Sequence, residues 1–362
     1  AIGRSALIAL TTGDNCVAVG SYALAANTTG ANNVALGQLA LDANTTASYN
    51  IAIGVNTLGA TTTGADNTAM GNAAMNTNTT GASNTAIGYT ALAANTTGAN
   101  NVAVGKNAMV TNTTGASNTA VGFQALNTAT TAANNTSVGH NALFNATTGA
   151  DNTAVGKSAG ENITTGAENV AVGVTALDAN TTGTRNTVLG HGALGALVGG
   201  YHENVAIGYN ALAVSTVNTG NVAIGAYAMD ATNSSSSTQC TAIGYKSMSG
   251  ALAGYGNTAV GDNTMLVATS AIENTCVGRS ALIALTTGDN NTAVGSFALD
   301  ANTTASNNTA VGYSALTANT TGTGNTAVGT LAGDAITTGT YNTTSGYAAA
   351  GAVTTGDGNV CI

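Results

Sequence analysis

The sequence contains no proline and no tryptophan, and it has very little charge. Only 6% of its 362 residues are charged, against roughly 25% in an ordinary soluble domain. Six basic residues against 15 acidic ones give a net charge of −9, so we expect no nucleic acid partner. No run of 18 apolar residues occurs, which excludes a transmembrane helix from this segment. The first residues lack the charged and apolar regions of a leader peptide, so we expect either that a leader has been removed or that the segment belongs to something longer. Disorder is also disfavoured, because 44% of the residues are hydrophobic.

What the chain has instead is a glycine every 17 residues. This spacing is interrupted by one 18-residue step, which ends at Gly208, and by one 19-residue step, which ends at Gly244. A fixed period shorter than any globular domain indicates stacked repeats, so residues 1–362 are predicted to form a single array. The first twelve glycines of this ladder are Gly3, Gly20, Gly37, Gly54, Gly71, Gly88, Gly105, Gly122, Gly139, Gly156, Gly173 and Gly190.

Residues 101–117 are a representative repeat, and their pattern predicts the structure of one coil. A β-branched residue such as Val104 precedes the glycine, and Ala103 precedes that residue. This alternation predicts a short strand whose Val/Ile side points inward. The Ala-Met or Ala-Leu pair after the glycine predicts a second short strand, and Asn-Thr-Thr-Gly predicts the turn that closes the coil. The expected fold is therefore all-β, a parallel β-solenoid or β-roll of about 21 coils with two short strands each and a dry Val/Ile/Leu core.

Asparagines recur at two places in this repeat. One precedes the strand, as in Asn84 and Asn101, and can form a ladder of stacked side-chain amides. The other begins Asn-Thr-Thr, as in Asn95 and Asn112, and matches the N-glycosylation sequon. We expect it at an exposed corner, although turn chemistry explains it without glycans.

The core pattern Asn-[Thr/Val]-Ala-[Val/Ile]-Gly-x-x-Ala-Leu resembles the head repeat of YadA-like trimeric autotransporter adhesins. The longer form that ends in Asn-Thr-Thr-Gly also resembles repeats in phage tail-fibre shafts. The resemblance covers essentially every repeat, and it implies a left-handed roll and association into trimers.

The two lengthened repeats are the places where binding residues could concentrate. Their extra residues should bulge outward at the turn, either as tolerated insertions or as contact loops. The candidate contacts are Tyr201, His202, Glu203, Ser234 and Ser235. The four cysteines are expected to be free small residues, with bonds between chains as the alternative: Cys16, Cys240, Cys276 and Cys361.

The repeats offer no recognisable chemistry. His140 and His191 share a repeat position but lie three coils apart, and acidic residues are too sparse for calcium-binding coils. No nucleophile and base constellation is present. We therefore expect no enzyme, no metal and no cofactor. Ice binding through threonine rows is less favoured, because adjacent threonines should face opposite sides.

These features predict a structural fibre or filament that lies outside the cell or in a virion fibre. Neither end shows a polar capping coil, so we expect either that the segment was cut from a longer chain or that its open ends stack on neighbouring molecules. The unchanged copy of Arg4 to Asn15 at Arg279 to Asn290 indicates recent duplication within an array. Copies of the chain are the expected partners, in a head-to-tail filament or a trimer. The alternative is an adhesin head or a phage tail-fibre shaft that binds host surface, matrix or glycan.

Overall fold

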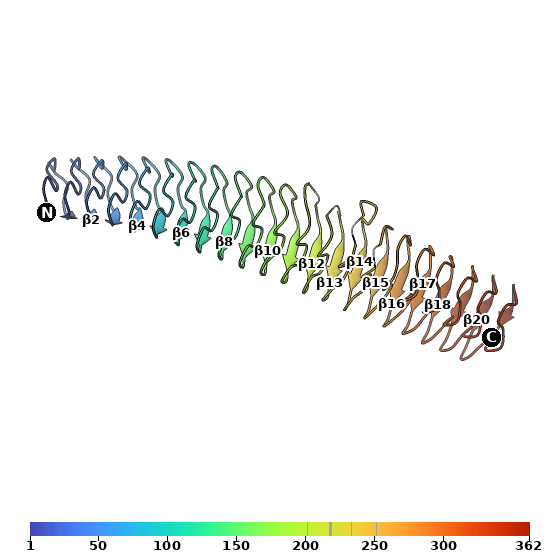
Figure 1. The fold of residues 1–362 in the computed structure, drawn as a ribbon. Helices are drawn as coiled ribbons and strands as arrows, with labels where there is room; N and C mark the ends of the chain where they lie inside the picture. Colours follow the sequence, from blue (N-terminus) through green and yellow to red (C-terminus); the bar gives the residue numbers. More distant parts are fainter. Residues whose placement is uncertain (201, 217–218, 233, 251) are drawn as a thin grey trace. The chain divides into compact units, whose positions relative to one another are not determined.

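The computed structural model describes residues 1–200, 202–216, 219–232, 234–250 and 252–362. The chain divides into two compact units, Ala1–Gly183 and Thr184–Ile362. Every regular element in the described ranges is a short β-strand, and each turn of the chain contributes one of them (Figure 1). The predicted all-β parallel solenoid is confirmed.

The first unit contains ten strands. Each pairs in parallel with the next, in a register of 17 residues, so that Val102 lies opposite Thr119. Their bounds are β1 Val17–Val19, β2 Val34–Leu36, β3 Ile51–Ile53, β4 Thr68–Met70, β5 Thr85–Ile87, β6 Val102–Val104, β7 Thr119–Val121, β8 Thr136–Val138, β9 Thr153–Val155 and β10 Val170–Val172.

The second unit contains eleven strands with the same parallel pairing, in which Thr292 lies opposite Thr309. The register is maintained across the two lengthened coils, where Thr187 pairs with Val205 and Val222 with Thr241. The bounds are β11 Thr187–Leu189, β12 Val205–Ile207, β13 Val222–Ile224, β14 Thr241–Ile243, β15 Thr258–Val260, β16 Thr275–Val277, β17 Thr292–Val294, β18 Thr309–Val311, β19 Thr326–Val328, β20 Thr343–Ser345 and β21 Val360–Cys361.

We number each coil from the residue before its strand, which is usually asparagine. In the coil 101–117, Asn101 is position 1, the strand occupies positions 2–4, the ladder glycine Gly105 is position 5 and Ser117 is position 17. The last two positions before the next asparagine are called positions 16 and 17 in the lengthened coils as well.

The predicted second strand is wrong. Positions 5–8 and 9–12 form two consecutive β-turns, closed by hydrogen bonds from Ala108 N to Gly105 O (3.3 Å) and from Asn112 N to Met109 O (3.4 Å). Asn107 and Met109 have φ of 60° and 51°, which a strand does not allow. The same two positions have positive φ in nearly every coil, so the Ala-Leu pair belongs to a compact turn.

The predicted orientation of the strand is also wrong. The middle residue, usually alanine, is buried, with Ala103 and Ala120 at 0% exposure. The flanking Val and Thr side chains face outward and are half-buried or exposed. The core is therefore not made of strand Val and Ile. It contains strand alanines, the Ala-Leu or Ala-Met pair of positions 8 and 9, and asparagines. A coil this tight has room only for a methyl group behind the strand.

The ladder glycines end the strands, as expected for a corner. All 21 have φ between 123° and 145°, a region that residues with a side chain rarely adopt. A Cβ on Gly105 would also lie under 3.0 Å from the carbonyl oxygen of Gly122 in the next coil. The 17-residue period therefore follows from both backbone conformation and close stacking.

The predicted asparagine ladder before the strand is confirmed. Asn101 Oδ1 accepts the backbone N–H of Asn118 at 3.0 Å, and Asn101 Nδ2 donates to Gly115 O at 2.9 Å. The first bond joins consecutive coils, and the second closes the coil on itself. These side chains satisfy backbone groups that would otherwise be buried without partners.

The sequon asparagines at position 12 form a second buried ladder, so their expected exposure is wrong. Asn95 Nδ2 donates to Asn78 Oδ1 at 2.8 Å and to Gly98 O at 2.9 Å. In the folded chain these residues offer no amide to a glycosylating enzyme. All eight expected at the exposed corner have 0% exposure: Asn27, Asn44, Asn78, Asn95, Asn112, Asn180, Asn302 and Asn319.

This second ladder is interrupted where another residue occupies position 12. Asn44 Oδ1 is buried without a hydrogen-bond partner, and the residue above it in the next coil is Thr61. Asn112 Oδ1 is unpaired in the same way next to Ala129. Each unsatisfied acceptor therefore marks a break in the ladder.

Thr61→Asn is expected to stabilise the fold by about 1 kcal/mol. Its Nδ2 would donate to Asn44 Oδ1, and its Oδ1 would accept from Asn78 Nδ2, which now lies 3.4 Å from the Thr61 hydroxyl. The measurement is the free energy of unfolding in urea. Thr63→Asn, at the exposed position 14 of the same coil, is the matched control and should leave it unchanged. Equal effects of the two substitutions would contradict the ladder's role.

Candidate interaction surfaces

The described part of the chain contains no pocket, and no three His, Cys, Asp or Glu side chains within it are placed to hold a metal ion. None of its segments is a helix long and apolar enough to cross a membrane. Exposed side chains line the outer surfaces of the stacked coils.

The first surface is the outward face of the strands, formed by positions 2 and 4. We call it the outer sheet face. In unit 1 it includes Val17 (47% exposed), Ile51 (38%) and Met70 (44%), and in unit 2 it includes Leu189 (48%) and Val328 (45%). Val, Ile, Leu, Met, Thr and Ser are the only residues at these positions in the 20 three-residue strands. Sequence reasoning missed this surface, although the absence of charge at both positions was visible in the repeat.

Two edges border the outer sheet face. The exit edge consists of positions 6 and 7, which follow the ladder glycine, and the entry edge consists of positions 16 and 17, which precede the next asparagine. Most charged residues of the exit edge are basic, and most charged residues of the entry edge are acidic. The exit edge carries one acidic residue, Asp262, and five basic ones: Arg4, Lys106, Lys157, Lys246 and Arg279. The entry edge carries one basic residue, Arg185, and eight acidic ones: Asp14, Asp66, Asp151, Glu168, Glu203, Glu273, Asp289 and Asp357.

The exit edge also carries aromatic rings that pack on one another. In unit 2, His191 stacks on Tyr209 with 5.4 Å between ring centroids, and Tyr209 meets Tyr227 edge to face at 5.3 Å. Tyr227 meets Tyr245 at 6.1 Å, and the ammonium of Lys246 lies 5.4 Å from the Tyr245 ring. His191 therefore belongs to an aromatic row that joins neighbouring coils, and no other histidine faces it there.

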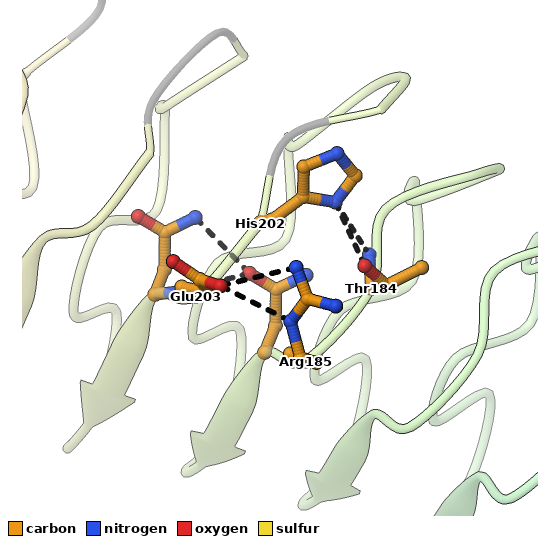
Figure 2. Close-up of polar contacts among 6 residues, drawn as sticks. Thr184, Arg185, His202 and Glu203 are labelled. Atoms are coloured by element: carbon orange, nitrogen blue, oxygen red, sulfur yellow. Dashed lines mark hydrogen bonds and ion pairs between the residues drawn. The ribbon is translucent and has the colours of Figure 1, made fainter.

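The residues predicted as loop contacts are partly engaged within the chain. His202 Nδ1 accepts the backbone N–H of Thr184 at 3.1 Å, and its contact with the Thr184 hydroxyl is 2.9 Å (Figure 2). Glu203 pairs with the Arg185 guanidinium at 3.0 Å. Both contacts join a lengthened coil to the coil before it. Tyr201 lies outside the described residues.

The serines of the other lengthened coil form a turn. Ser234 Oγ accepts the backbone N–H of Ser236 at 3.2 Å, and Ser234 O accepts that of Ser237 at 3.0 Å. Ser235 is exposed at this turn. The four-serine segment thus forms a turn at the corner where an insertion was expected.

The cysteines are free thiols with two different environments. Cys16 and Cys361 are partly exposed, whereas Cys240 and Cys276 are buried. Burial raises the pKa of the Cys276 thiol, and burial is also the largest cause of the raised pKa of Cys240. A bond between chains is therefore open to Cys16 and Cys361 but not to the two buried thiols.

Thiol labelling of the native protein is expected to modify Cys16 and Cys361 and to spare Cys240 and Cys276, because a thiol reacts as the exposed thiolate. Mass spectrometry of the labelled peptides reads out each site, and all four should react after denaturation. Fast native labelling of Cys276 would contradict its burial.

The paired threonines of positions 13 and 14 provide a single outward row. Thr96 Oγ1 donates to Thr113 O at 3.0 Å, so the first threonine of each pair joins neighbouring coils. The second, such as Thr97, is exposed. Thr12 to Thr182 form an uninterrupted row of exposed threonines at this position in unit 1.

The comparisons with known proteins identify no relative. No family model matches the chain, and a search of curated proteins finds no match.

Proposed function

We propose that this protein is a non-catalytic structural component of a fibre, in which copies of the chain pack side by side through the outer sheet face. The observation that carries the proposal is that this face is free of charge and that position 4 is Val, Ile, Leu or Met in 19 of the 20 three-residue strands, beside a row of Thr, Val and Ile at position 2. A sheet with one face in water normally alternates apolar and polar residues, whereas a parallel sheet is usually covered on both faces. Here the inner face is covered by the coil, and the outer face is equally free of charge.

A second copy of the chain is the partner that fits this surface best. The chain has a net charge of −9, and none of its charged residues lies at positions 2 and 4 of the three-residue strands, so contact through this face keeps the carboxylates of two copies out of the interface. The outer sheet faces can meet without burying a charge. Identical coils at the same spacing, about 4.8 Å per coil, also allow side chains of two copies to interdigitate along many strands.

The placement of such a fibre outside the cell or in a virion rests on the resemblance of the repeat to adhesin heads and tail-fibre shafts. Backbone ladders in every coil and a core with little charge suit a component that must resist force and proteases. Negative-stain imaging of the purified protein tests the proposal: assemblies wider than one chain support it, and isolated single chains would overturn it.

An adhesive role is the second candidate, and the aromatic row of the exit edge favours it. Tyr209 and Tyr245 are each 48% exposed, and aromatic side chains are frequent in binding surfaces. Binding of the wild type to immobilised glycans or matrix proteins, lost in a Tyr209→Ala, Tyr245→Ala variant, would support this role. Equal binding by both proteins would exclude the row as the binding surface.

A further inference from the structure

We infer that the partner copy lies parallel to the first chain, related to it by a two-fold axis along the coil stack. This inference rests on the proposed side-by-side association, and it concerns its geometry. The observation behind it is the division of charge between the two edges of the outer sheet face.

The division can be followed across single strands. Asp151 precedes β9 and Lys157 follows it, while Glu273 precedes β16 and Arg279 follows it. In each case five residues, three of them in the strand, separate the two charges, so the two Cα atoms lie at most about 20 Å apart. All four side chains are exposed. One strand in each unit therefore has an acidic end and a basic end.

Among the residues that the structure describes, these four charges have no ionic partner. The pair Arg185–Glu203 is the one ion pair formed among the described residues. Asp151 accepts a hydrogen bond from the neutral amide of Asn134 at 3.1 Å. The Arg279 guanidinium lies 4.7 Å from the centroid of the Phe297 ring, which orients it without neutralising it. The exit-edge cations are thus available to carboxylates of another chain.

The orientation of the partner decides which edges meet. If two copies face each other around an axis parallel to the coil stack, the exit edge of one lies against the entry edge of the other. Lys157 then meets Asp151 of the partner subunit at zero offset, and Arg279 meets the partner's Glu273. If the copies are antiparallel, with the two-fold axis across the stack, exit edge meets exit edge and acidic entry edges meet each other. Juxtaposed like charges are unfavourable and select against that arrangement.

The charges also favour some offsets between the copies over others. A shift of one coil still places Lys157 opposite a carboxylate, because Glu168 precedes β10. A shift of two coils places Lys157 opposite Arg185, a like charge, but a shift of four coils again brings opposite charges together, because Lys106 then lies opposite Glu168. The outer sheet face alone would tolerate any whole-coil shift, and the edge charges disfavour only some of them. A pair closed by a two-fold axis along the stack has zero offset by symmetry.

Charge reversal tests the edges. Lys157→Glu with Arg279→Glu is expected to weaken self-association by about tenfold or more, since like charges would then meet. Asp151→Lys with Glu273→Lys should do the same. In the protein with all four substitutions the basic and acidic residues have exchanged places at both strands, so opposite charges face each other again. Its self-association should return to within about threefold of the wild type. Failure of the fourfold variant to recover would overturn the pairing.

The orientation is measured with single spin labels on the exit edge at Gln38, Asn72 and His140, each in a Cys16→Ser, Cys361→Ser background. Parallel copies give the same label-to-label distance at all three sites. Antiparallel copies give distances that change from site to site, because each site then lies at a different distance from the two-fold axis. Unequal distances would refute the parallel arrangement while leaving association intact, whereas a monomeric protein with no measurable distance would refute the proposed function itself.

Discussion

Replacing Gly105 by alanine is expected to destabilise the protein by about 4 kcal/mol, since a Gly-only backbone region and an overpacked contact each cost roughly 1–3 kcal/mol. Gly105 has φ of 135°, and a Cβ there would collide with the Gly122 carbonyl. The clash cannot be relieved by a rotamer change because the neighbouring atom belongs to the backbone. Urea unfolding measures the loss, and limited proteolysis shows whether the coils around residue 105 open first.

Gly115→Ala in the same coil is the control. Position 15 does not have positive φ, and the next coil carries Ala132 there, fully buried. A Cβ on Gly115 would also meet a backbone carbonyl oxygen, that of Ala132, so this variant shares the steric contact of Gly105 but lacks its positive φ, and we expect a smaller loss of stability. If both substitutions cost the same, the ladder glycines would be needed for space alone and not for their backbone conformation.

The second large effect concerns association. Changing Val104, Val121 and Val138 to lysine is expected to weaken self-association by at least about 100-fold, because each buried ammonium costs several kcal/mol in desolvation. These valines occupy position 4 of β6, β7 and β8 and face outward. The fold itself should persist, since the core residues behind them are unchanged.

The control for this experiment adds the same charge elsewhere. Thr97, Thr114 and Thr131 are exposed at position 14 of three consecutive coils, and their change to lysine raises the net charge equally. Mass photometry of the two triple variants separates a surface effect from a general charge effect. Dissociation of both variants, or of neither, would show that the outer sheet face is not the contact.

The sequence was sufficient to predict the repeat, the parallel solenoid, the glycine corners and the asparagine ladder before the strand. Each of these depends on residues that recur at fixed spacing and have one dominant physical role. Glycine at position 5 reflects a positive φ, and asparagine at position 1 reflects a backbone N–H that needs an acceptor, as between Asn101 and Asn118.

The sequence did not show in the same way which face of the strand is buried and which is exposed. Alternation of Val and Ala predicts two faces but not which one is buried, and the usual preference of large apolar residues for the core gave the wrong answer. The tight coil reverses that preference, because Ala103 must fit behind the strand while Val104 remains at the surface. Likewise the pattern Ala-Met at 108–109 gave no sign that Met109 would adopt φ of 51°.

The interaction surfaces were predicted less well than the fold. The loops of the lengthened coils were the expected sites, yet His202 and Glu203 are held by Thr184 and Arg185. The outer sheet face was assigned to the core and therefore overlooked. Its signal in the sequence is an absence, namely that no charged residue occupies positions 2 and 4 in any three-residue strand.

Sedimentation velocity of the wild-type protein over a wide range of concentrations tests the central claim most directly. If the outer sheet face is covered by another copy, the protein sediments as a defined assembly heavier than the 34.7 kDa chain. That assembly should persist at high salt, because the apolar face is not screened, while its formation slows as the edge charges are screened. A single species at the mass of one chain at every concentration would contradict the account.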